Sequence, residues 1–518
     1  MALASRVRHA TFTPAQVSGF YFRPCRDDHD EVIDEYFRCR CGTVRKQTRR
    51  NGCSNLIQHI RREHPDYEAV MLAASTAETG SVLNYVRQSA LNVYGWMDWI
   101  LKNNLPLSFC ENRAARRLAS FNNLIYTKLD PICVKTLVSA MDSLTRVVER
   151  SIATELPDRF GLLFDGWTHA SEHFVAVFAC YEIDGVRKTP LLSMAPLLEA
   201  LDDDLSARGH MEFLAKMLPR DFGRQLSQCL FLVAASSSVN RLLATLMGVP
   251  LIGCASHRLN LAVQADMEEF GPDQDLVQSL MLKLRTISQS AKLRIKTGLR
   301  PVIRQDTRWG STFAMHLDKN DDALEDFFPP AAATRRLRGL LKDLKKVESV
   351  AKALQCSEIT MLDVRVWFDG LLLIKPQCER YIGPRAAIVH SPDFEAACVG
   401  VLGGQTSRLT RGKKAALQPF CSPIAEEQNS SNESSDGEER SFVEQLQKRR
   451  CLQAKEQRYE LLSSIHPTSN VAERFFSTAR ITYGQERHGL QPITLEMILF
   501  LRQNCSCWDA RTFDDATR

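Results

Sequence analysis

The stretch FGLLFDGWTHASEHFVAVFACYEIDG, residues 160–185, decides the fold of the central part of the chain. It contains two apolar runs of strand length, GLLF ahead of Asp165 and HFVAVFACYEI after it, and Asp184-Gly185 predicts a tight turn. The segment VRKTPLLSMAPL can then form a third strand. The stretch therefore predicts an antiparallel meander with a carboxylate at the end of its first strand.

Helices and strands alternate after this meander. The predicted elements are a helix at MEFLAKML, a strand at CLFLVAA, a helix at VNRLLATLMG that ends at Gly248, a strand at PLIGCA and a helix at HRLNLAVQADMEEF. Because the order is βββαβαβ, we expect an α/β domain at residues 158–270. Its first and fourth strands should be parallel neighbours.

The regions on either side of this domain are predominantly helical by their apolar spacing. Residues 75–157 predict a helical domain, and residues 271–424 predict a large helical region interrupted at TRWGSTF, Pro329-Pro330 and VLGGQTSRLTRGKK. The fold class is therefore α/β plus α.

The last part of the chain begins with an acidic segment. AEEQNSSNESSDGEE has six acids and no base, which predicts a disordered linker at residues 425–440. In residues 441–518 we expect a long polar helix around Phe442 to Ser464, and then a helix that carries VAERFFSTARI.

Composition excludes several classes of protein. The chain has 518 residues, 44% of them hydrophobic and 25% charged, which predicts three or four structural units and excludes wholesale disorder. No apolar run approaches the roughly 18 residues of a membrane-spanning helix, so we expect no membrane partner. Residues 1–16 lack the apolar core of a secretory signal. The 16 cysteines are widely spread, so close pairs are first tested as metal ligands.

The first candidate site lies in residues 1–74 and combines two cysteines with two histidines: Cys39, Cys41, His59 and His64. Thiolate and imidazole suit tetrahedral zinc, and two histidines five residues apart on a helix from Ser54 to Glu63 can converge on one ion. The usual cysteine pair has at least two intervening residues, so Cys25 or Cys53 stays open as a fourth ligand. So small a unit has too little core to be stable without a staple.

The same region is basic. Tyr36 to His64 contains eight Lys and Arg residues and one acid, although the net charge of the whole chain is only +5. YFRCRCGTVRKQTRRNGCSNLIQHIRREHP resembles a BED-type zinc finger, a module found at the N-termini of hAT-superfamily transposases and of proteins derived from them. The resemblance implies a Zn²⁺ ion, double-stranded DNA as the partner and a nuclear location. The side chains able to neutralise phosphates are Arg45, Lys46, Arg49, Arg50, Arg61 and Arg62.

Asp165 in FGLLFDGW resembles the first catalytic aspartate of the hAT transposases. The resemblance implies an RNase H-like core, interrupted by the helical insertion, in which converging carboxylates hold two Mg²⁺ ions. CLFLVAASSSVNRLLA resembles the family's next strand and helix, where an Asp-Asn pair precedes the residue that matches Asn240. Here that pair is Ala235-Ser236, so the second metal-binding carboxylate is missing.

Three further segments resemble the family. Cys254-Ala255-Ser256-His257 resembles a motif that supports the active site and contacts DNA in the family. An alternative, in which Cys254 is a nucleophile and His257 is its base, is less favoured. Thr307-Arg308-Trp309 resembles a motif near DNA ends, making Arg308 and Trp309 DNA-binding candidates. SNVAERFFS, residues 469–477, resembles the C-terminal signature and makes Glu473 the third catalytic carboxylate. The family's dimerisation region follows, which implies self-association.

The sequence therefore predicts a zinc-dependent DNA-binding protein derived from a hAT-type transposase and catalytically impaired at Ala235. Two alternatives stay open. One is an active transposase, for which alone Mg²⁺ would be a cofactor and in which Asp165 and Glu473 act with a substitute ligand. The other is an interaction or dimerisation factor without catalysis.

Overall fold

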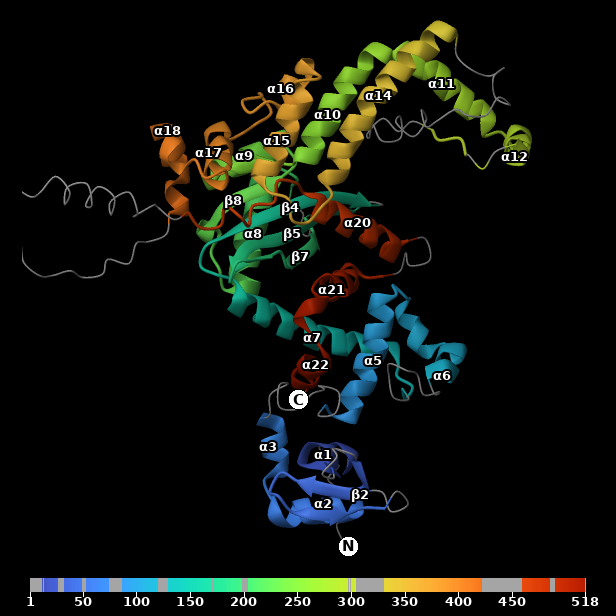
Figure 1. The fold of residues 1–518 in the computed structure, drawn as a ribbon, viewed down its shortest axis with the longest axis vertical. Helices are drawn as coiled ribbons and strands as arrows, with labels where there is room; N and C mark the ends of the chain where they lie inside the picture. Colours follow the sequence, from blue (N-terminus) through green and yellow to red (C-terminus); the bar gives the residue numbers. More distant parts are fainter. Residues whose placement is uncertain are drawn as a thin grey trace, which may run out of the picture. The chain divides into compact units, whose positions relative to one another are not determined.

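The computed structural model describes residues 12, 14–26, 32–48, 53–73, 86–119, 129–169, 172–197, 204–296, 298, 300–303, 330–421, 459–484 and 490–517. The chain forms two compact units, residues 1–155 with 479–518, and residues 156–478. Figure 1 shows the elements of both units. The protein is of mixed α/β class, with one small sheet in the first unit and one larger mixed sheet in the second.

The N-terminal part of the first unit is a three-stranded antiparallel sheet with helices. Its elements are α1 (Pro14–Tyr21), β1 (Phe22–Arg26), β2 (Val32–Cys39), β3 (Val44–Lys46), α2 (Ser54–Glu63) and α3 (Tyr67–Ala73). The predicted helix from Ser54 to Glu63 is confirmed, while α1 and α3 were not predicted. Its core is small and centres on Phe20, Phe22, Leu56 and Ile60.

The remaining helices of the first unit come from both ends of the chain. They are α5 (Gln88–Lys102), α6 (Arg113–Ala119), α7 (Val134–Glu155), α21 (Pro492–Gln503) and α22 (Ala510–Ala516). Helices α21 and α22 pack against α5 and α7. Arg87, which precedes α5, forms an ion pair of 2.5 Å with the buried carboxylate of Asp514 in α22. This pair attaches the end of the chain to the predicted helical region.

The second unit is built on a six-stranded sheet. Its strands are β4 (Phe160–His169), β5 (Glu172–Ile183), β6 (Val186–Lys188), β7 (Leu191–Pro196), β8 (Cys229–Ala234) and β9 (Leu251–Gly253). The order is β6-β5-β4-β8-β9, and β7 also pairs with β5. Strands β4 and β8 are parallel, as predicted for the first and fourth strands. The predicted third strand is divided into β6 and β7.

Three helices connect these strands in the predicted order: α8 (Ala207–Phe222), α9 (Ser238–Met247) and α10 (Ala255–Met267). Helix α9 ends at Gly248, whose φ of 68° is the left-handed conformation that glycine adopts most easily. Close packing between β4 and β8 requires glycine at position 161. A Cβ atom at Gly161 in β4 would lie 2.0 Å from the ring of Phe231 in β8.

Helix α20 (Asn470–Tyr483) runs beside the sheet. The Phe476 ring stacks on Trp167 of β4 at 5.9 Å, and Phe475 meets Phe178 of β5 edge to face. Val471 and Phe475 are four residues apart, a spacing that predicts one common buried face of the helix. Val471 is only half-buried, and Ala472 joins the two phenylalanines in the buried face instead.

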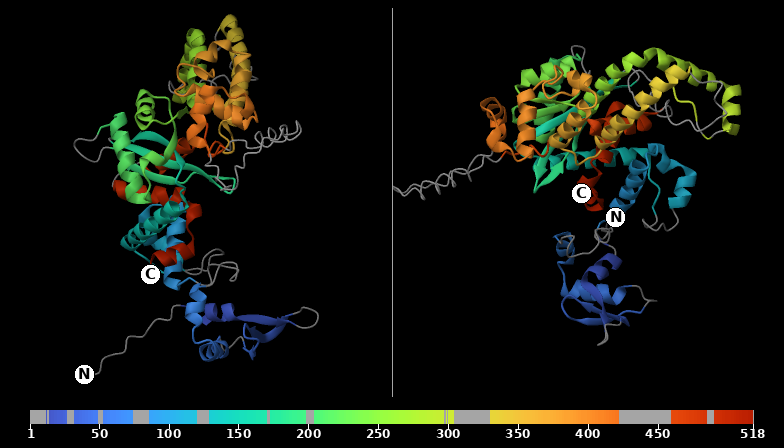
Figure 2. Two further views of the ribbon diagram at one scale, coloured as in Figure 1. Left: turned by 90° about the vertical axis from the view of Figure 1, so that its left-hand side faces the viewer. Right: turned by 45° about the horizontal axis from the view of Figure 1, so that its top comes forward.

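Residues 271–421 are helical wherever the structure describes them, apart from short connections. The helices are α11 (Gly271–Leu284), α12 (Ile287–Lys296), α14 (Ala331–Ala353), α15 (Met361–Leu372), α16 (Glu379–Ile382), α17 (Pro392–Leu402) and α18 (Arg411–Leu417). Helices α10, α14 and α15 lie side by side in all views (Figures 1 and 2) and share one apolar cluster that includes Leu259, Leu340 and Phe368. The helical region therefore shares its core with the helix that follows β9.

The predicted helix from Phe442 to Ser464 is wrong at its end. Tyr459 forms an isolated bridge with Cys421, and Leu461 has a φ of 64°, so the chain is not helical there. Residues 442–458 and the predicted linker at 425–440 lie outside the described part. Among the described residues, no helix combines the length and apolar character needed to cross a membrane.

Candidate functional site

The structure brings the four predicted zinc ligands together. Cys39 ends β2, Cys41 lies in the turn before β3, His59 lies in α2, and His64 directly follows α2. The sulfur of Cys39 is 3.4 Å from Nε2 of His64, and the sulfur of Cys41 is 3.3 Å from Nε2 of His59. All four ligand atoms lie within 4.8 Å of one another. Two thiols and two imidazoles at these separations could hold one metal ion in a Cys₂His₂ arrangement.

A tight turn brings Cys39 and Cys41 close together although only one residue separates them. The Gly42 amide donates to the carbonyl of Cys39, and the Cys39 amide donates to the carbonyl of Thr43. Gly42 has a φ of 90°, a conformation that a side chain would strain. Interaction with the Thr43 hydroxyl and amide lowers the pKa of Cys41 to about 5, whereas burial raises the pKa of Cys39. The exposed thiol is thus the more readily ionised of the two.

Packing fixes the histidine side of the site. The ring of His64 lies 4.7 Å from Tyr21, and the ring of His59 lies 5.6 Å from Phe22. Cys25 and Cys53, which the sequence left open as substitute ligands, do not belong to the cluster of four. The one-residue spacing is therefore sufficient for the two cysteines to reach the histidines.

The basic residues predicted to bind DNA lie on two elements of this finger. Lys46 of β3 and Arg61 and Arg62 of α2 are exposed, while Arg45 of β3 is half-buried. Lys46 lies 3.6 Å from Glu35, and Arg62 lies 2.7 Å from Glu63. Arg49 and Arg50 fall outside the described residues, as do Arg308 and Trp309.

The second candidate site lies at the carboxyl edge of the larger sheet. The last parallel pairs are Leu163 with Val233 between β4 and β8, and Ala234 with Gly253 between β8 and β9. Continuing this register places Asp165, Ala235 and Cys254 side by side, where β8 and β9 end. The prediction that the first strand ends at Asp165 is wrong, because β4 continues to His169 in its pairing with β5. Ligand sites in sheets of this kind form where strands end at such an edge.

Two helices add side chains to this edge. His257 lies in the first turn of α10, and Glu473 lies in the first turn of α20. Nδ1 of His257 is 3.9 Å from Oε1 of Glu473, and ligand atoms of Cys254, His257 and Glu473 all lie within 4.8 Å of one another. His257 and Glu473, which are far apart in the sequence, therefore lie close together. The neighbour of His257 is an acid, whereas the sequence predicted that this histidine contacts DNA.

The charges of this edge are coupled. Burial raises the pKa of Asp165 to about 6, opposed by the charge of His257 and reinforced by that of Glu473. Interaction with the Cys254 sulfur raises the pKa of His257 to about 9 despite burial, with Glu473 and Asp165 adding to the effect. Burial acts to raise the pKa of Cys254, but His257 and Ser469 outweigh it and lower the value. The edge therefore favours a thiolate beside an imidazolium.

The donor set does not fit two magnesium ions. Magnesium prefers oxygen ligands, and the edge position next to Asp165 carries only the methyl group of Ala235, whose carbonyl accepts a hydrogen bond of 2.8 Å from Asn240. The alternative in which Cys254 attacks a substrate is also unfavourable, because this residue is fully buried. The edge instead offers one sulfur, one nitrogen and carboxylate oxygens.

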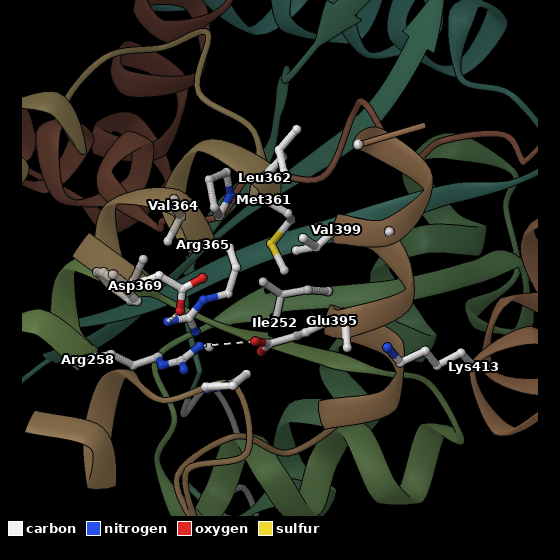
Figure 3. Close-up of a pocket in the computed structure, with 18 of the residues that line it drawn as sticks. Ile252, Arg258, Met361, Leu362, Val364, Arg365, Asp369, Glu395, Val399 and Lys413 are labelled. Atoms are coloured by element: carbon white, nitrogen blue, oxygen red, sulfur yellow. Dashed lines mark hydrogen bonds and ion pairs between the residues drawn. The ribbon is translucent and has the colours of Figure 1, made fainter. Parts of the chain in front are cut away.

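A cavity of about 370 Å³ lies nearby in the second unit (Figure 3). Arg258 pairs with Glu395 at 3.1 Å and also donates to the carbonyls of Tyr381 and Gly383. Arg365 pairs with Asp369 at 2.7 Å. Because these contacts satisfy the Arg258 guanidinium, this arginine attaches α10 to the helical region.

Spacing named Cys39, Cys41, His59 and His64 as candidate ligands and left Cys25 and Cys53 open, whereas the cluster of Cys254, His257 and Glu473 was not predicted as a metal-ligand set. The Cys-x-x-His spacing was a signal for it; the acid is distant in sequence. Comparison with protein-family models gives no match, and comparison with curated proteins likewise finds no significant match.

Proposed function

We propose that the protein binds double-stranded DNA through the zinc finger of residues 12–73, and that it derives from a hAT-type transposase whose catalysis is impaired. The observation that carries the proposal is the convergence of Cys39, Cys41, His59 and His64 beside a helix with exposed basic residues. Zinc would staple a unit whose own apolar core is small.

The exposed face of α2 supports DNA as the partner. Its buried residues Leu56, His59 and Ile60 face the core, while Gln58, Arg61 and Arg62 are exposed. Arginine and glutamine are side chains that hydrogen-bond phosphates and base edges. A helix with this polar face suits the major groove of a duplex, and Lys46 can add a phosphate contact.

The residues at the carboxyl edge of the larger sheet support the proposal that catalysis is impaired. The order of its strands and helices supports the proposal of an RNase H-like core, in which the helices of residues 271–421 would be the insertion. In that proposal Asp165 and Glu473 are retained carboxylates, and Ala235 stands where a third is required. Losing one ligand of a two-metal site removes much of the charge stabilisation that the ions supply.

The test is binding of the full chain to a random duplex library, with zinc bound and with zinc chelated, over about 50 to 200 mM salt. We expect zinc-dependent binding that weakens with salt. Arg61→Gln with Arg62→Gln should reduce the magnitude of the slope of log K against log salt by about 2. Each phosphate contact that is lost reduces the number of counterions released on binding. The charge-matched control is Arg335→Gln with Arg338→Gln, two exposed residues of α14.

The outcomes separate the alternatives. Absence of binding at low salt with zinc present would reject DNA as the partner and favour an interaction factor. Nicking of the selected duplex that requires Mg²⁺ or Mn²⁺, and that Asp165→Asn and Glu473→Gln both abolish, would instead show a working transposase. We expect no nicking by the natural chain.

A further inference from the structure

The cluster of Cys254, His257 and Glu473 is held in place by its own backbone. The Ser469 amide donates to the Cys254 sulfur at 3.2 Å, and the Ala255 amide donates to the Pro467 carbonyl at 2.9 Å. These two bonds hold the segment Pro467–Ser469 against the junction of β9 and α10. Since α20 begins directly after this segment, Glu473 lies in the first turn of α20 and therefore close to Cys254 and His257.

One atom of the cluster lacks the partner that its burial requires. Nδ1 of His257 is buried and has no hydrogen-bond partner of normal geometry among the described residues. Its nearest acid, Glu473, is 3.9 Å away, which is too far for a hydrogen bond. An unpaired buried nitrogen is destabilising, so a ligand outside the described side chains is expected to satisfy it.

A bound cation satisfies these groups together. Ligands of a tetrahedral zinc ion are about 2.0–2.3 Å from the metal, which places neighbouring ligand atoms roughly 3.3–3.8 Å apart. The atoms here lie within 4.8 Å of one another, and Nδ1 of His257 is 3.9 Å from Oε1 of Glu473. Small side-chain movements would therefore close the cluster around one ion.

We propose that Cys254, His257 and Glu473 bind a second zinc ion, at the carboxyl edge of the larger sheet, with a fourth position left for water or for Asp165. A soft sulfur and an imidazole select zinc over magnesium, which is bound by oxygen. Three protein ligands with one open position are also the ligand number of catalytic zinc sites. The proposal does not depend on DNA binding, because the finger contributes no ligand to it.

The first test is the metal content of the full-length protein, purified under reducing conditions and measured by mass spectrometry of the metal. We expect two zinc ions per chain. Cys41→Ser with His59→Ala should retain one ion, and His257→Ala with Glu473→Gln should also retain one. Cys356→Ser, a change at an exposed cysteine outside both clusters, should retain two.

The second test identifies the ligands with cobalt in place of zinc. In the variant without finger ligands, the remaining Co²⁺ should show a sulfur-to-metal absorption band of one thiolate. Adding Glu473→Gln, a half-exposed position that is expected to preserve folding, should weaken binding by more than the roughly 10–100-fold cost of losing an outer-shell partner. One zinc ion in the natural chain, or an unchanged cobalt affinity in that variant, overturns the proposal.

Discussion

The two clusters of candidate metal ligands differ in how the chain assembles them. The finger collects its ligands from one short segment between Cys39 and His64, whereas the sheet-edge cluster joins residues of β9, α10 and α20 that are far apart in the sequence. The finger core is small. The sheet edge instead rests on a sheet in which the first five residues of β4 and all but one residue of β8 are buried.

This difference determines what a metal does in each place. Where the apolar core is small, metal binding supplies the free energy of folding. Where the sheet already folds on its own core, a metal adds stability to a scaffold that exists without it. Loss of the metal should therefore affect the finger more than the sheet unit.

Removal of zinc should unfold the finger. Metal binding in small fingers is worth about 10–16 kcal/mol, whereas a core of this size rarely supplies more than about 3–5 kcal/mol. Chelation, or Cys41→Ser, should therefore abolish the hydrogen-exchange protection of β2 and α2. Cys53→Ser should preserve it. Protection of α2 that survives chelation would show that the finger folds without its metal.

Zinc at the sheet edge should stabilise the second unit by a smaller amount. At a free concentration about 1,000 times the Kd, one ion adds about 4 kcal/mol. The shift appears as a higher urea midpoint for the exchange of β4 and β8 amides. Glu473→Gln should remove the zinc-dependent shift, and Glu358→Gln, the same change at an exposed acid, should leave it intact. A full shift in the Glu473 variant contradicts this prediction.

Gly161→Ala should destabilise the second unit without affecting the finger. The new methyl group would meet the ring of Phe231 at 2.0 Å, and overpacking of this kind costs about 1–3 kcal/mol. Urea unfolding followed at β4 measures the loss. The control is Gly339→Ala in α14, where nothing lies within 4 Å of the new atom. Because alanine favours a helix interior, that change should stabilise by about 0.5–1 kcal/mol.

The contrast also explains what the sequence could predict. The candidate finger ligands could be named from spacing because they lie around one turn and one helix, although spacing alone left Cys25 and Cys53 open. The strand order was predictable because apolar runs of β4, β5 and β8 alternate with clear helix signals and Gly248 ends a helix. These signals are local, so a single sequence carries them.

The rest depends on long-range contacts. Leu461 adopts a left-handed conformation, and Tyr459 pairs with Cys421 where polar periodicity predicted a helix. Tertiary contacts override weak helix propensity in such a segment. Likewise, no local pattern shows that the Ser469 amide donates to the Cys254 sulfur. Only the fold reveals that Glu473 joins a cysteine and a histidine.

An effect of similar size concerns His466, next to the segment that positions α20. This histidine is buried, and its Nε2 is 2.7 Å from the Thr189 hydroxyl. Burial, with the charges of Arg187 and Arg474, lowers its pKa to about 3. The unfolded chain therefore binds a proton below about pH 6.5 that the folded chain does not, so this histidine destabilises the fold as the pH falls.

His466→Gln keeps a neutral hydrogen-bonding side chain and removes this titration. Between pH 7 and pH 5 the natural chain should lose about 2 kcal/mol more than the variant. The measurement is the urea midpoint of β4 and β8 exchange at both pH values, with zinc chelated so that ligand protonation does not contribute. Parallel loss in the two proteins would mean that His466 is protonated in the folded state as easily as in the unfolded chain. A smaller loss in the variant would identify this buried histidine, and not the metal, as a source of acid sensitivity in the sheet unit.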